Sequence, residues 1–535
     1  MSHVHRCTQS DFVFSTIYGD AEANSTITWL QSLREAMPLP ALNAEHRFTA
    51  ADMFLMANPD DFSTADQPGL PALTTFAQRW LQGWVTGLHL LPFHPAASQD
   101  PHATSDFRRV NASLGTWRDL LPLADQFWLM ADLSLQRTAS DHPWFAGFRA
   151  DDPNYADYYL SKEESALNYQ NPQVLREMSA AMLHYVYRGA RLVRLVDVER
   201  LWQRDGETKL HDTRSHLVMR FLRSVANEIS PGLRLMAGVN ANQGETALYG
   251  GNGENEASFL PNSAFAPMLL HALWTSDTRA FRAWAAGMSL PFPEVMFYNQ
   301  IDSLETVALQ PAARLLNTEQ LNLLAQQCEA HGGIAARNAL GEPFELRLRL
   351  WDALRSTAGE PENTGVARYL AAHAVLFSLV GLPAVSISSV LAPALPAQIL
   401  PGGRVAISQK VDLDVVETQM QTPGSPLRKV VDGLKVLQKA RAAVPAFDPA
   451  GVQTILDPGE SVFGVLRFSL FETGLVICLT NFSNQVRGAC VDINEAGFEV
   501  ETWHDVLTGT TYSAEQARQL TLQAYQSMWL VPAED

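Results

Sequence analysis

The sequence predicts an α/β fold: a closed (β/α)8 barrel with a helical extension before it and a small antiparallel β domain after it. Over roughly 400 residues, short apolar segments alternate with longer amphipathic ones, and about eight such units close a barrel. After about Phe447 the helical segments give way to alternating strands separated by turns, a pattern typical of a β-sandwich. With 535 residues, 47% of them hydrophobic, the chain can form more than one domain.

The predicted elements divide the chain into residues 1–50, 51–446 and 447–535. ITWLQSLREAM is the clearest helix of the N-terminal extension. The barrel strands are expected in MFLMANP from Met53, GLHLLPF from Gly87, FWLMADLSL from Phe127, ARLVRLV from Ala190 and GLRLMAGV from Gly232. The barrel helices are expected in LTTFAQRWLQGW from Leu73, NPQVLREMSAAMLHYVYRG from Asn171 and SHLVMRFLRSVANEI from Ser215.

One long apolar segment, YLAAHAVLFSLVGLPAVSISSVL from Tyr369, resembles a membrane span in length. His373, Gly381 and Pro383 interrupt it, and its last part is rich in Val, Ile and Ser. We therefore expect a buried helix, a turn and a buried strand.

The composition narrows the possible partners. The net charge of −18 disfavours nucleic acid and anionic membranes. The N-terminus has no apolar core of the signal-peptide kind, so we expect a cytoplasmic protein. The four cysteines are too widely spaced for a disulfide framework or a zinc site, and no motif indicates a metal or a cofactor.

Several segments, in the same order along nearly the whole chain, carry a family resemblance. They are LHLLPFHPAASQD, SDFRRVNASLGTW, DHPWF, LNYQNPQVL, YGGNGENEA, FELRLRLWDAL and QKVDLD. Together they resemble glycoside hydrolase family 13, the α-amylase family, in its sucrose phosphorylase and glucosylglycerate phosphorylase branch. The resemblance implies retaining glycosyl transfer, which uses one carboxylate as nucleophile and a second carboxyl group as acid/base.

At the two positions where the family carries these carboxyl groups, the sequence has none. The nucleophile of the family follows Arg-Leu, and here Arg194-Leu195 is followed by Val196. The acid/base position corresponds to Gly238 in MAGVN. Since valine cannot attack and glycine cannot donate a proton, no catalytic residue is expected at either position.

The groups that support catalysis in the family are partly retained. Arg194, Asp132, Asp302 and Asp106 match positions of a remnant substrate site, and Arg137 adds positive charge at the same rim. Gln136 and Arg137 replace an Asn-His pair, and Ile301 replaces a sugar-binding histidine. The family's domain B is truncated to residues 160–166, which predicts an open, wet mouth. The retained charges fit a sugar or anion site, but also the ion-pair network that a buried arginine needs.

Three other carboxylates are candidates to replace the lost pair. Asp197 follows Val196 directly, but alternation along a strand predicts that its side chain faces the helices. A β-bulge would be needed to rotate it inward. Glu199 lies in the following loop, and Glu245 lies in the polar segment NANQGE.

Three functions follow from these observations. The first is a catalytically inactive homologue with a role in binding, sensing or partnering, whose ligand is a glucoside or a sugar phosphate or whose partner is an active homologue or another protein. The second is an atypical glycoside phosphorylase or hydrolase with a displaced carboxylate. The third is a carbohydrate-binding protein without turnover. The architecture of the barrel mouth around Arg194 distinguishes them.

Overall fold

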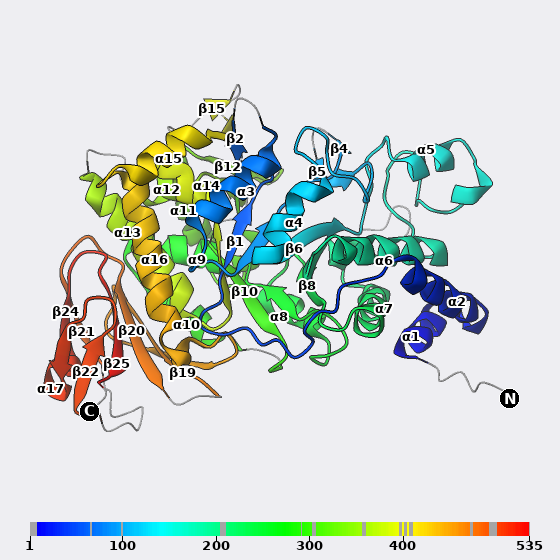
Figure 1. Ribbon diagram of the computed structural model, residues 1–535. Helices are drawn as coiled ribbons and strands as arrows, with labels where there is room; N and C mark the ends of the chain where they lie inside the picture. Colours follow the sequence, from blue (N-terminus) through cyan, green and yellow to red (C-terminus); the bar gives the residue numbers. More distant parts are fainter. Residues whose placement is uncertain are drawn as a thin grey trace.

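The computed structural model (Figure 1) contains a barrel flanked by two smaller units. It describes residues 8–64, 67–97, 100–203, 210–289, 292–301, 306–355, 360–394, 399–400, 404–405, 410–470, 474–491 and 500–533.

Eight parallel strands form the predicted closed barrel, hydrogen-bonded in the order β1-β14-β10-β9-β8-β7-β6-β3. Their bounds are β1 Phe54–Ala57, β3 Gly87–Leu90, β6 Trp128–Ser134, β7 Leu192–Val196, β8 Arg234–Gly238, β9 Phe259–Pro261, β10 Met296–Gln300 and β14 Leu382–Ser386. One cluster of large apolar side chains joins residues of all these strands except β3: Phe54, Met56, Met130, Leu192, Met236, Phe259, Tyr298, Leu382 and Ala384. The barrel is therefore a packed core rather than a pore.

Helices between the strands cover the outside of the barrel. The longer ones are α3 Gly69–Trp80, α4 Trp117–Gln126, α6 Pro172–Tyr187, α7 Thr213–Ile229, α9 Phe265–Thr275, α10 Arg279–Ala286, α13 Glu362–Ser378 and α16 Pro426–Ala442. The apolar segment after Tyr369 forms the end of α13 and strand β14, as predicted, but its last residues form the short helix α14 (Ile387–Leu391) instead of continuing the strand. Within the described residues, no helix is long and apolar enough to cross a membrane.

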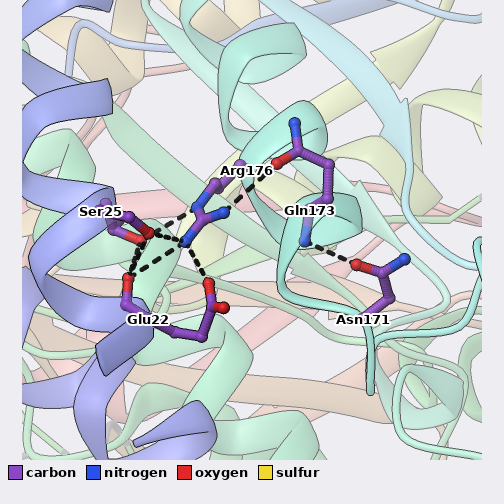
Figure 2. A network of polar contacts seen from close by, with 6 residues as sticks. Glu22, Ser25, Asn171, Gln173 and Arg176 are labelled. Atoms are coloured by element: carbon purple, nitrogen blue, oxygen red, sulfur yellow. Dashed lines mark hydrogen bonds and ion pairs between the residues drawn. The ribbon is translucent and has the colours of Figure 1, made fainter. Parts of the chain in front are cut away.

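Two helices, α1 (Gln9–Tyr18) and α2 (Asp20–Ala36), form the N-terminal extension beside α6 and α7. Figure 2 shows how Arg176 of α6 holds α2. Its Nη2 donates to Glu22 Oε2 at 2.8 Å and to Ser25 Oγ at 2.6 Å. Its Nε donates to Thr26 Oγ1 at 3.0 Å. A mostly buried guanidinium therefore joins α2 to the barrel, while Ser10 of α1 bonds to Glu228 of α7 through its N–H at 2.9 Å and its hydroxyl at 2.6 Å.

The connection from β6 to β7 is short where the family carries domain B. It contains only α5 (Pro143–Arg149) and a 3₁₀ turn before α6. Leu160 N–H donates to the Ala166 carbonyl at 3.0 Å, and Tyr159 forms a β-bridge with Leu167. These contacts close residues 160–166 into a tight turn, which has no room for a further domain.

An antiparallel sheet of three strands lies in the connection between β10 and β14. Its order is β11-β13-β12, with bounds β11 Thr306–Ala308, β12 Ile334–Arg337 and β13 Pro343–Arg347. This sheet was not among the elements expected from the sequence.

The C-terminal unit packs a six-stranded antiparallel sheet against the pair β21 and β24 (Figure 1). The strands are β18 Val452–Leu456, β19 Val462–Phe468, β20 Leu475–Asn481, β21 Arg487–Cys490, β22 Thr502–Asp505, β23 Thr511–Ser513, β24 Gln519–Leu522 and β25 Ser527–Pro532. The apolar side chains between the sheets form a core of their own. We propose residues 1–50, 51–446 and 447–535 as the boundaries of the three units.

Candidate functional site

A cavity of about 260 Å³ opens at the carboxyl ends of the barrel strands, where barrel enzymes carry their active sites. Arg194 and Val196 of β7, Met236 and Gly238 of β8, and Gln300 of β10 border it. Its other lining residues are Asp197, Val239, Asn240, Pro261, Asn262, Ser263, Ala266, Thr306, Val307, Ala308 and Glu345.

Val196 and Gly238 are direct neighbours at the floor of this cavity. They are register partners, because β7 and β8 pair in parallel with Val196 opposite Gly238. A Cβ atom on Gly238 would lie 2.8 Å from the Leu195 carbonyl oxygen and 3.0 Å from Val196 Cα. Both contacts are with backbone, so a larger residue at position 238 needs a shift of the strands themselves.

Asp197 borders the same cavity, although strand alternation predicted that it faces the helices. The alternation does not extend to it, because β7 ends at Val196. Asp197 adopts a left-handed conformation (φ 59°, ψ 38°), and its N–H donates to the Gly238 carbonyl at 2.9 Å. This conformation turns the chain without a bulge.

Glu199 and Glu245 do not border the cavity among its described lining residues. Glu199 is buried, and within the described part of the chain one of its carboxylate oxygens has no hydrogen-bond partner. Burial raises the pKa of Glu199, and the nearby charge of Asp197 raises it further. Glu245 lies on the short helix α8 (Gln243–Ala247), with Oε2 at 4.0 Å from His211 Nε2.

Asp132 and Arg194 lie at the centre of a buried network beneath the cavity. Arg194 Nε is 3.4 Å from Asp132 Oδ1, and His89 Nε2 donates to the same oxygen at 2.8 Å. Burial alone would raise the pKa of Asp132, but Arg194 and His89 lower it to about 2. Burial lowers the pKa of His89, so its neutral ring donates through Nε2 while Nδ1 faces the Tyr298 hydroxyl at 3.2 Å.

The remaining predicted site residues lie apart from this network. Arg137 is exposed, and its backbone forms a bridge with Ala166. The Asp106 side chain accepts a hydrogen bond from the N–H of Arg108 at 2.8 Å within its own loop. Asp106 borders a different cavity. Asp302 lies outside the described residues.

Six polar residues at the cavity were not expected as site residues from the sequence: Asn240, Asn262, Ser263, Gln300, Thr306 and Glu345. Thr306 and Glu345 belong to the inserted sheet, which forms a wall of the cavity. The inserted sheet thus walls the mouth on one side, while the open, wet mouth expected from the missing domain B stays a prediction. The alternating segment FELRLR was the available signal, because it indicates a strand with one polar face.

The cavity has few groups suited to acid/base or metal chemistry. Its carboxylates among the described residues are Asp197 and Glu345, and Glu345 Oε1 accepts from Arg347 Nε at 2.6 Å. No three His, Cys, Asp or Glu side chains of the described chain gather in an arrangement that could hold a metal ion.

Comparison with known proteins places this geometry in a family. No protein-family model matches the chain. It is 31% identical over 471 residues to the glucosylglycerate phosphorylase of Allomeiothermus silvanus, covering 80% of this chain and 85% of that protein. It is 28% identical to the glucosylglycerate phosphorylase of Spirochaeta thermophila, covering 98% of both.

Solved structures agree at the level of the fold. The sucrose 6F-phosphate phosphorylase of Thermoanaerobacter thermosaccharolyticum is similar with a TM-score of 0.68 at 16% identity, covering 82% of this chain and 94% of that one. An α-amylase from Geobacillus thermoleovorans is similar with a TM-score of 0.64 at 12% identity, covering 92% of this chain and 100% of that one. The chain belongs to the sucrose phosphorylase and glucosylglycerate phosphorylase branch of glycoside hydrolase family 13.

Proposed function

We propose that this protein does not catalyse the phosphorolysis of its relatives and instead binds a glucoside or a sugar phosphate at the barrel mouth. The observation that carries the proposal is the pair Val196 and Gly238. It occupies the ends of two neighbouring strands, where the resemblance places the nucleophile and the acid/base. Neither side chain can form a bond to a sugar or transfer a proton.

The polar groups around the cavity support binding without turnover. Arg194, Asn240, Asn262 and Gln300 border it, and the buried Oε1 of Gln300 has no hydrogen-bond partner among the residues that the structure describes. Such an acceptor gains from a ligand hydroxyl group, because a buried polar atom without a partner costs free energy. Sugars present hydroxyl donors of this kind.

An atypical phosphorylase that uses Asp197 is the second candidate. The observation in its favour is that Asp197 and Glu345 border the same cavity. A retaining mechanism needs two carboxyl groups about 5 Å apart across the sugar. Against it, Oε1 of Glu345 already accepts a hydrogen bond from Arg347 Nε on the same strand, so this oxygen is engaged by the protein rather than aimed at a substrate.

The decisive experiment combines glucosylglycerate and inorganic phosphate with the protein and measures glucose 1-phosphate. The glucosylglycerate phosphorylase of Allomeiothermus silvanus serves as the positive control. We expect no product above background from this protein. Turnover that disappears in Asp197→Asn would overturn the proposal and establish the second candidate. The substitution preserves the fold, because asparagine also tolerates the left-handed conformation.

Binding is measured separately by thermal shift with glucosylglycerate, glucose and glucose 1-phosphate. A ligand that binds the native state raises the apparent stability. We expect glucosylglycerate to give a shift that Gln300→Leu reduces. Gln327→Leu, on helix α11 (Thr318–Ala330) away from the cavity, should leave that shift unchanged. No shift with any of the three ligands would leave a scaffold or partner role and would contradict sugar binding.

The proposal includes a reducing, cytoplasmic setting. Cys328, Cys478 and Cys490 are free, and the first two are buried. Free cysteines fit a compartment in which thiols stay reduced. A partner, whether an active homologue or another protein, is the remaining alternative to a small ligand.

A further inference from the structure

We propose a second ligand site at the opposite, N-terminal mouth of the barrel, suited to a small hydroxylated anion of the sugar phosphate class. The cavity there has a volume of about 690 Å³, within the range of small-molecule sites. Residues just before or at the start of four barrel strands border it: Asp52 before β1, Thr86 before β3, Trp128 of β6 and Arg191 before β7. It is therefore separate from the cavity at Val196.

The cavity gathers positive charge in a protein whose net charge is −18. Arg191 borders it together with Lys435 and Lys439 of α16. Neither lysine forms an ion pair within the described part of the chain. The nearby carboxylate, Asp52, already accepts from the N–H of Thr49 at 2.8 Å and from its hydroxyl at 3.2 Å. The cavity thus carries an excess of cationic groups, which favours an anion.

Aromatic rings hold two of these cations in place. Lys435 Nζ lies 5.8 Å from the centroid of the Trp84 ring, and Arg191 Cζ lies 5.5 Å from that of Trp128. Arg191 Nη2 also donates to the Ala124 carbonyl at 3.2 Å. Both rings border the cavity, so a ligand with an apolar ring face can pack against them.

The side chain of Gln438 indicates that the ligand carries hydroxyl groups. Its side chain borders the cavity and is 2% exposed. Nε2 donates to the Ala51 carbonyl at 2.7 Å, whereas the buried Oε1 has no partner among the described residues. A hydroxyl donor from a ligand would satisfy this acceptor. An anionic group, an apolar ring face and hydroxyl donors are together the properties of a sugar phosphate.

The test is titration calorimetry with three probes: glucose 1-phosphate, inorganic phosphate and glucose. We expect glucose 1-phosphate to bind best, inorganic phosphate to bind more weakly, and glucose to give no heat at the same concentration. Lys435→Gln combined with Lys439→Gln should weaken glucose 1-phosphate roughly tenfold or more. Lys429→Gln is the matched control, because Lys429 lies on the same helix but pairs with Glu362 outside the cavity.

The result also separates this site from the proposed site at the other mouth. Asn240→Trp fills the cavity at the carboxyl ends from a lining position that is exposed. If the lysine variants bind like the native protein, or if Asn240→Trp alone removes binding, the N-terminal site is refuted while the first proposal stands. Equal affinity for inorganic phosphate and glucose 1-phosphate would refute the sugar part. Binding at the N-terminal site is independent of whether the protein catalyses phosphorolysis.

Discussion

A Cβ atom on Gly238 would lie 2.8 Å from the carbonyl oxygen of Leu195 on the neighbouring strand. The close approach of β7 and β8 thus excludes a side chain at the position where the family resemblance places its acid/base. Val196, the register partner of Gly238, fills the neighbouring position with an apolar side chain.

The close approach predicts that Gly238→Ala destabilises the protein. Overpacking against a rigid backbone typically costs about 1–3 kcal/mol. Urea denaturation measures the change in the free energy of unfolding. Gly365→Ala is the matched control, because Gly365 lies in helix α13 and, among the described residues, its added methyl meets only the flexible side chain of Arg355, at 3.4 Å. This control should gain about 0.5–1 kcal/mol.

Restoring the two carboxyl groups is predicted not to restore phosphorolysis. In Val196→Asp with Gly238→Glu, the strands must move to admit the new side chain, so the two carboxyl groups would not reach the geometry that catalysis needs. The assay is glucose 1-phosphate formation from glucosylglycerate and phosphate, with thermal unfolding as a check that the variant folds. Recovered turnover in a folded variant would show that the backbone can adapt.

The Asp132 and Arg194 pair predicts strong coupling in a double-mutant cycle. Asp132→Asn leaves the largely buried guanidinium without its counter-charge, which should cost about 3 kcal/mol. In the background of Arg194→Met the same change should cost much less, because no charge remains to be balanced. Urea denaturation of the four proteins gives the coupling free energy. Additive effects would mean that the pair does not stabilise the core.

Buried histidines predict a loss of stability as the pH falls. Burial lowers the pKa of His94 and His373 to about 4, from 6.5. Between these values the unfolded chain binds more protons than the folded protein. The free energy of unfolding therefore falls as the pH decreases from about 6.5 to about 4. Denaturation at about pH 7 and about pH 5 measures this slope, which His373→Leu should reduce. An unchanged slope in that variant would exclude His373 as a source.

The Arg176 contacts predict that one substitution loosens the N-terminal helices. Arg176→Ala removes the hydrogen bonds to Glu22, Ser25 and Thr26. Amide exchange in α1 and α2 should become faster while the barrel strands stay protected. Arg79→Ala is the control. The Arg79 side chain is exposed, so its ion pair with Glu417 should contribute little to stability. If both substitutions speed amide exchange in α1 and α2 equally, Arg176 is not a specific anchor of these helices.

The sequence by itself determined the barrel and the C-terminal sandwich, and it has no carboxyl group at Val196 or Gly238, the positions where the family resemblance places the catalytic pair. These features depend on local patterns. Alternating apolar residues identify strands, and a residue without a carboxyl group cannot act as the nucleophile or the acid/base. The positions of Val196 and Gly238 in neighbouring strands also follow from the order of the strands in a parallel barrel.

Only the tertiary structure decided which groups border the two mouths. Asp197 reaches the cavity because its backbone turns left-handed where β7 ends, a conformation that strand alternation does not predict. The inserted sheet brings Glu345 to the same cavity across a long sequence separation. Likewise, Arg191 and Lys435 meet at the opposite mouth only because helix α16 packs beneath the barrel. Such proximity depends on packing between distant segments, which no local pattern encodes.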